Sequence, residues 1–171
     1  PDFSALIEEV RALRTGEGLP EVQPSPQVNA TLRHYQLEGL AWMDFLRRAR
    51  LGGVLADDMG LGKTLQALTL LQGEQDAGRM DRPSLVVVPT SLIGNWEAEA
   101  RRFTPGIKVL VLHGPQRLQH FGRIAQAQLV LTTYPLAVRD IDTLATHDCQ
   151  GISERDITMA AFIDNCAKKT S

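Results

Sequence analysis

The sequence predicts an α/β fold, a mainly parallel β-sheet with helices on both faces. Apolar runs at residues 85–89, 107–114 and 128–133 predict strands, and segments with helical periodicity at 91–103 and 115–127 separate them. A Gly-rich turn at 57–64 joins a further apolar run to an amphipathic segment. Because parallel strands need long crossover connections, strands that alternate with helices favour a parallel sheet buried on both sides.

Composition sets wide limits on the function. The chain has 171 residues, 43% of them hydrophobic and 22% charged, which suits one soluble domain. No apolar run approaches the roughly 20 residues of a membrane span, so no membrane partner is expected. Cys149 and Cys166 have neither metal-site spacing nor a disulfide framework, which favours an intracellular location. With a net charge of −2, any nucleic-acid binding must come from local patches.

The N-terminal region, residues 1–28, is expected to hold a helix and a Pro-rich linker. Apolar positions within residues 3–14 have helical spacing, and three prolines follow within residues 20–26. Asn29 or Thr31 is expected to cap a second helix that ends near Arg50. The basic residues at its end, Arg47, Arg48 and Arg50, are interpreted as partners of the helix dipole and of solvent.

The segment 57–64, with the sequence DDMGLGKT, resembles a phosphate-binding loop. Val54–Ala56 is expected to enter it as a short buried strand. Glycines let backbone N–H groups converge on phosphate oxygens, Lys63 adds a positive charge, and the Thr64 hydroxyl suits Mg²⁺. The helix that follows presents its positive N-terminus to the anion. Asp57 stands where the general pattern has glycine, and the alternative is an ordinary Gly-rich turn. The candidate ATP-binding residues here are Asp57, Asp58, Met59, Gly60, Leu61, Gly62, Lys63 and Thr64.

Five segments in order resemble the Swi/Snf-type DNA-dependent ATPases, helicase-like translocases of superfamily two. They are LRHYQLEGLAWM, DDMGLGKT, LVVVPTSLIGNWEAEARRF, VLHG and LVLTTYPLAVRD. The resemblance covers about residues 30–150, and an acidic pair before MGLGKT is usual in that family. It implies that residues 29–150 form the first part of a RecA-like P-loop lobe. It also implies ATP and Mg²⁺ as cofactors, duplex DNA as a partner, and a cytoplasmic location, or a nucleoid-associated one in a bacterium.

The same resemblance assigns roles to individual residues. Gln36 would recognise adenine and Arg33 would frame the pocket. Without the resemblance, Gln36 would be interpreted as an exposed glutamine on an amphipathic helix. The DNA-contact candidates are Thr90, Ser91, Asn95, His113, Gly114, Thr132 and Thr133. Ser91 could equally cap its helix, and Trp96 is expected in the core.

After Gly151 the sequence departs from the family pattern. The family has an acidic motif on a later strand, and Glu154 and Asp156 do not match it because Arg155 separates them and no apolar strand precedes them. Residues 151–171 instead have the periodicity of a capped amphipathic helix. Without that motif and the second lobe, the chain is expected to bind ATP but to hydrolyse it negligibly. The alternative is a non-hydrolysing nucleotide-binding or protein-interaction module. A small kinase has no support beyond the loop.

Overall fold

The computed structural model of the chain describes residues 18–56, 58 and 60–146, together with residues 4, 7–8 and 10–11. The described positions before residue 12 are helical, as the apolar spacing predicts, and Ile7 and Val10 are 52% and 45% exposed. The predicted tail at 151–171 lies outside the described residues. In the described part of the chain, no helix has both the length and the apolar composition to cross a membrane.

Three parallel strands form the sheet in the described residues: β1 (Ser84–Val87), β2 (Val109–Val111) and β3 (Leu129–Thr132). The order is β1-β3-β2, so the last strand in the sequence is central. Val130 of β3 pairs with Leu85 on one side and Leu110 on the other. All of β3 is buried, as expected for a central strand with both faces covered. The strands predicted at 85–89, 107–114 and 128–133 are thus confirmed.

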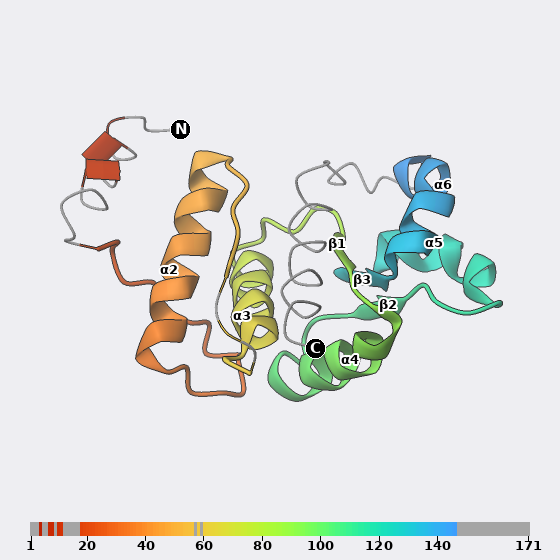
Figure 1. The fold of residues 1–171 in the computed structure, drawn as a ribbon, viewed down its shortest axis with the longest axis horizontal. Helices are drawn as coiled ribbons and strands as arrows, with labels where there is room; N and C mark the ends of the chain where they lie inside the picture. Colours follow the sequence, from red (N-terminus) through yellow and green to blue (C-terminus); the bar gives the residue numbers. More distant parts are fainter. Residues whose placement is uncertain are drawn as a thin grey trace.

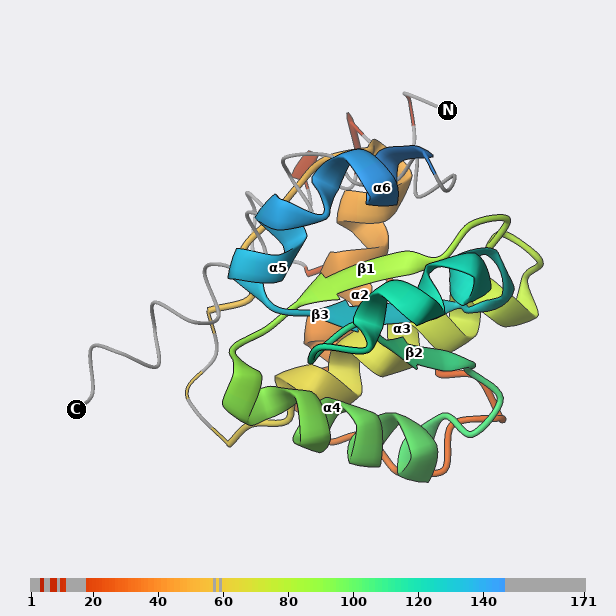
Figure 2. The ribbon, with the colours of Figure 1, turned by 90° about the vertical axis from the view of Figure 1, so that its right-hand side faces the viewer.

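Helices α3 (Lys63–Asp76) and α4 (Thr90–Phe103) lie on one face of the sheet (Figure 1, Figure 2). Leu68 of α3 and Trp96 of α4 pack with Leu129 and Leu131 of β3. Trp96 is only 5% exposed, so the prediction of core packing is confirmed.

The other face carries the 3₁₀-helix η1 (Arg117–Gln126) and the short helices α5 (Tyr134–Arg139) and α6 (Ile141–Thr146). Ile124 of η1 and Leu144 of α6 pack with Leu110 and Val130. Successive residues of a strand point to opposite faces, so β3 supplies side chains to both layers. The segment predicted as helical at 115–127 takes the tighter 3₁₀ form.

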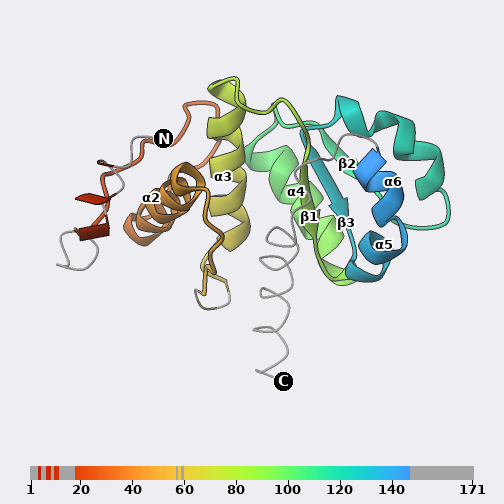
Figure 3. The ribbon, with the colours of Figure 1, turned by 90° about the horizontal axis from the view of Figure 1, so that it is seen from above.

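Helix α2 (His34–Ala49) packs along α3 at the edge of the molecule (Figure 1, Figure 3). The predicted cap at Asn29 or Thr31 is wrong, because the helix begins at His34 with Arg33 in the N-cap position. The N–H of Asn29 donates instead to the carbonyl of Phe103 at the end of α4, at 2.8 Å. Ser25 donates to Asp76 at the end of α3. The residues before α2 are therefore anchored to neighbouring helices rather than helical themselves.

The strand predicted at Val54–Ala56 is also absent. Residues 51–56 have no strand conformation, and Val54 is 41% exposed. A strand depends on hydrogen bonds from a neighbour, and among the described residues β1 pairs only with β3. Leu55 packs instead against the apolar cluster between α2 and α3, which includes Leu40 and Met43. The Trp42 ring packs against the backbone of Gly53.

Candidate functional site

The Gly-rich loop turns directly into α3, as predicted. Gly60 and Gly62 have φ angles of 83° and 79°, a left-handed conformation that glycine adopts without strain. Gly62 is the N-cap residue, and α3 begins at Lys63. The first N–H groups of a helix have no partner within it, so the turn presents backbone donors and a positive dipole end at one place. Asp57 and Met59 lie outside the described residues.

Lys63 and Thr64 form the first turn of α3. The Lys63 ammonium group donates to the backbone carbonyl of Asp58 at 2.9 Å, which bends this side chain back over the loop. Thr64 is half-buried, and the Asp58 side chain is exposed. A flexible cation, a hydroxyl and backbone N–H groups at one helix end suit a polyphosphate with a divalent cation.

Gln36 reaches the same loop from α2. Its Nε2 donates to the carbonyl of Leu61 at 3.0 Å, and its Oε1 accepts from the N–H of Arg33 at 2.9 Å. The side chain is only 6% exposed, so the interpretation of Gln36 as an exposed surface residue is wrong. Arg33 itself is exposed beside it. The structure therefore brings together Gln36 and the loop, which are separated by 25 residues in the sequence.

Gly62 allows this approach. A β-carbon at Gly62 would lie 2.6 Å from Nε2 of Gln36, too close for two non-bonded atoms. Its φ angle of 79° excludes most other residues independently. Glycine is thus needed at position 62 both for the conformation of the turn and for the close approach of the Gln36 amide.

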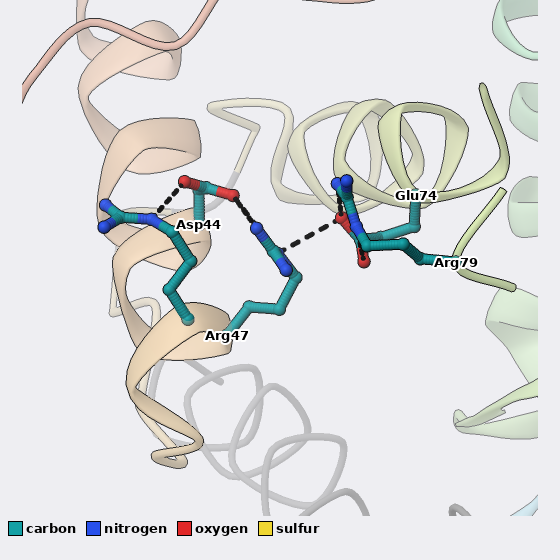
Figure 4. A network of polar contacts seen from close by, with 5 residues as sticks. Asp44, Arg47, Glu74 and Arg79 are labelled. Carbon is teal, nitrogen blue, oxygen red and sulfur yellow. Dashed lines mark hydrogen bonds and ion pairs between the residues drawn. The ribbon is translucent and has the colours of Figure 1, made fainter. Parts of the chain in front are cut away.

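An ion-pair network fixes α2 against α3 (Figure 4). Asp44 accepts from Arg47 at 2.7 Å and from Arg48 at 2.9 Å. Arg47 also pairs with Glu74 of α3 at 3.1 Å, and Arg79 donates to the same carboxylate at 2.6 Å. Burial acts to raise the pKa of Asp44, but the two arginines outweigh it and lower that pKa below its ordinary value. Arg47 and Arg48 therefore form ion pairs with carboxylates, in addition to the predicted interaction with the helix dipole and solvent.

The residues after β1 lead into α4 on the carboxyl side of the sheet. Thr90, Ser91 and Asn95 are exposed there, as DNA contacts would require. The alternative role of Ser91 as a helix cap is not found, because α4 begins at Thr90 and Pro89 precedes it without a side-chain cap bond.

The remaining DNA-contact candidates lie at the same ends of β2 and β3, and they fall into two groups. His113 is exposed, and Gly114 has a φ angle of 79°. Thr132 and Thr133 are buried, with 1% and 4% exposure, and the Thr132 hydroxyl donates to the carbonyl of Leu112 at 3.0 Å. Thr132 thus bonds the end of β3 to the residue that follows β2.

A buried pair that the sequence analysis missed holds this edge together. Arg117 donates to both carboxylate oxygens of Asp140, at 2.7 and 2.9 Å, and its side chain is only 10% exposed. The hydrogen bond to Asp140 raises the pKa of Arg117 above its ordinary value. The pair ties the segment after β2 to the segment after β3. The only sequence signal was that Asp140 closes the LVLTTYPLAVRD motif.

Known proteins of one family match this chain in sequence. A family model described as the SNF2-related domain matches residues 35–161. The chain is 39% identical over 140 residues to YwqA of Bacillus subtilis, covering 80% of this chain and 15% of that protein. It is 41% identical over 130 residues to the nuclear protein STH1/NPS1 of Saccharomyces cerevisiae, covering 74% of this chain and 10% of that protein. The chain therefore spans only a small part of the length of these relatives.

The fold resembles a solved SWI2/SNF2 ATPase core of Sulfolobus solfataricus in complex with dsDNA. The TM-score is 0.66 at 35% identity, covering 72% of this chain and 25% of that one. A second solved structure, of the Sulfolobus solfataricus SWI2/SNF2 ATPase core domain, gives a TM-score of 0.65 at 34% identity, covering 73% of this chain and 25% of that one. This likeness confirms the predicted α/β class with a RecA-like architecture.

Proposed function

The chain belongs to the SNF2-related family, and on that premise we propose that it is the ATP-binding portion of a DNA-dependent translocase. The observation that carries this proposal is the contact between Gln36 and the Gly-rich loop. The amide of Gln36 is bonded to the carbonyl of Leu61, two residues before Lys63. A group suited to a base and a group suited to phosphates thus lie on neighbouring parts of one site.

Gln36 retains the hydrogen-bonding capacity that adenine recognition needs. A side-chain amide has two N–H donors and an oxygen with two lone pairs. In the described residues, one donor serves Leu61 and one lone pair serves Arg33. One donor and one acceptor remain, which match the N7 acceptor and the N6 amino donor of adenine. In this proposal Arg33 frames the pocket from the exposed end of α2.

The phosphate tail of ATP would lie against the start of α3. Backbone N–H groups after Gly60 and the Lys63 ammonium group would bind the phosphate oxygens and offset their negative charge. The Thr64 hydroxyl would bind Mg²⁺. The carbonyl of Asp58 that Lys63 now contacts would be exchanged for a phosphate oxygen. Bound Mg²⁺ would screen the charge of the phosphates.

Duplex DNA is the proposed partner at the carboxyl edge of the sheet. The exposed residues Thr90, Ser91, Asn95 and His113 can donate to phosphate oxygens, and Gly114 lets the backbone approach closely. We propose that Thr132 and Thr133 act through their backbone or by supporting this edge, because both side chains are buried.

The test is a titration with fluorescently labelled ATP. Lys63→Ala should weaken binding about tenfold or more, because a phosphate loses a charge-assisted hydrogen bond. Lys108→Ala is the matched control, because Lys108 is exposed and precedes β2 on another part of the molecule. Equal ATP affinities for wild type and Lys63→Ala would contradict the proposal that the Gly-rich loop binds the phosphates.

A further inference from the structure

We propose that Tyr35 is a positioning residue that aims the backbone N–H of Gly62 at the phosphate tail of the nucleotide. The proposal rests on the proposed ATP site and adds a residue to it. Tyr35 lies in the first turn of α2, beside Gln36, and is half-buried. Its hydroxyl donates to the carbonyl of Leu61 at 3.3 Å.

Two donors from one helix turn therefore hold a single carbonyl of the loop. Tyr35 Oη and Gln36 Nε2 both bond to the oxygen of Leu61, at 3.3 and 3.0 Å. This carbonyl lies between Gly60 and Gly62, whose φ angles are 83° and 79°. The carbonyl belongs to the peptide group that joins Leu61 to Gly62, and because glycine has little steric restriction, rotation about the φ of Gly62 would otherwise be easy.

Holding the carbonyl also sets the direction of an N–H group. The peptide group that joins Leu61 to Gly62 is planar and trans, so its C=O and N–H point in opposite directions. With the carbonyl directed at α2, the N–H of Gly62 is directed away from α2. The N–H of Gly62 would then point to the same side as the next two N–H groups of the chain, those of Lys63 and Thr64 at the start of α3. Together these groups would face the phosphate tail.

Tyr35 has a separate part in this arrangement. Gln36 is the residue proposed to bind adenine, and any shift of its amide toward the base would loosen its bond to Leu61. The Tyr35 hydroxyl keeps the carbonyl in place when that happens. Tyr35 thereby couples base recognition on α2 to phosphate binding on the loop, without touching the nucleotide.

The substitution Tyr35→Phe tests this, because it removes the hydroxyl and keeps the ring. ATP affinity should fall roughly two- to tenfold, the range for one hydrogen bond, whereas adenosine affinity should not change. Tyr134→Phe is the matched control, because Tyr134 is 55% exposed at the start of α5. In nucleotide-free protein, the amide NMR signal of Gly62 should shift in Tyr35→Phe and not in Tyr134→Phe.

The outcomes separate the two proposals. If the wild-type chain does not bind ATP, the proposed function fails and this inference fails with it. If ATP binding depends on Lys63 but not on the Tyr35 hydroxyl, only this inference fails. An equal loss of ATP and adenosine affinity would make Tyr35 part of the base pocket and would overturn the positioning role. An unmoved Gly62 signal in Tyr35→Phe would overturn it as well.

Discussion

Gln36 is a buried polar residue whose burial is compensated by the loop it contacts. At 6% exposure, an amide without partners would cost on the order of 1–3 kcal/mol. The bonds to Leu61 and Arg33 offset that cost and fix which end of the amide is the oxygen. A fixed amide can distinguish bases, because adenine and guanine differ in the group at position six.

Gln36→Ala should narrow the difference between ATP and GTP affinity. Guanine has a carbonyl oxygen where adenine has an amino group, so the amide oxygen of Gln36 would face another acceptor. One well-placed pair is worth about 1–3 kcal/mol, so the wild type should prefer ATP by about fivefold or more. Competition of each nucleotide against a labelled ATP analogue measures this preference. Gln119→Ala, at an exposed position on η1, is the control. A wild-type chain that binds both nucleotides equally would contradict the assignment.

At the scale of elements, the placement of α2 on α3 determines whether the site exists. The first turn of α2 carries Tyr35 and Gln36, and its last turn carries the arginines bound to Asp44 and Glu74. The two ends of α2 are therefore both attached, one to the Gly-rich loop and the other to the end of α3. The Arg117–Asp140 pair makes a comparable connection at the carboxyl edge of the sheet.

The contribution of Asp44 to stability should depend on pH. Its pKa is lowered in the folded protein, so its stabilising effect is complete above the unfolded-state pKa of about 3.9 and is lost as the pH falls through the folded-state pKa. Asp44→Asn should therefore be less stable than wild type at pH 7, and the difference should shrink at acidic pH. Thermal unfolding between pH 7 and pH 3 measures it.

Asp81→Asn provides the control for this experiment, because the Asp81 side chain is 81% exposed. Its Tm should follow that of the wild type across the range. A difference between wild type and Asp44→Asn that stays constant or grows as the pH falls would show that the carboxylate charge is not what holds α2 in place.

For the whole molecule, catalysis requires more than the nucleotide site. Phosphoryl transfer needs a carboxylate that orients the attacking water and a cation that stabilises the transition state. The acidic motif expected after the last strand is not recognisable in the sequence. We therefore expect near-background ATPase activity from this chain by itself.

Steady-state phosphate release with and without duplex DNA checks this expectation. DNA should have no effect on the rate, and DNA binding should be weak and salt-sensitive, given the net charge of −2. A clear DNA-stimulated rate that Lys63→Ala abolishes would contradict the expectation. In that case, Glu154 and Asp156 would return as candidate catalytic carboxylates.

Several features of the protein follow from the sequence by itself. The alternation of strands and helices, the parallel sheet and the start of α3 at the Gly-rich loop all depend on local periodicity and on glycine conformation. The predicted burial of Trp96 is confirmed for the same reason, since it lies on the apolar stripe of α4. The choice of Gln36 came from the family resemblance, and its adenine-binding role stays a prediction.

Other features were decided only by tertiary structure, because they depend on what lies opposite a segment. Val54–Ala56 is as apolar as a strand but has no strand beside it among the described residues. Helix α2 begins at His34, where the N–H of Arg33 donates to the side chain of Gln36, and the N–H of Asn29 bonds instead to the end of α4. Arg117 and Asp140 form one buried pair although 23 positions separate them. Tyr35 and Leu61 likewise meet only when α2 packs on α3. Periodicity reports which face of a segment is apolar, whereas partners distant in sequence are chosen by packing.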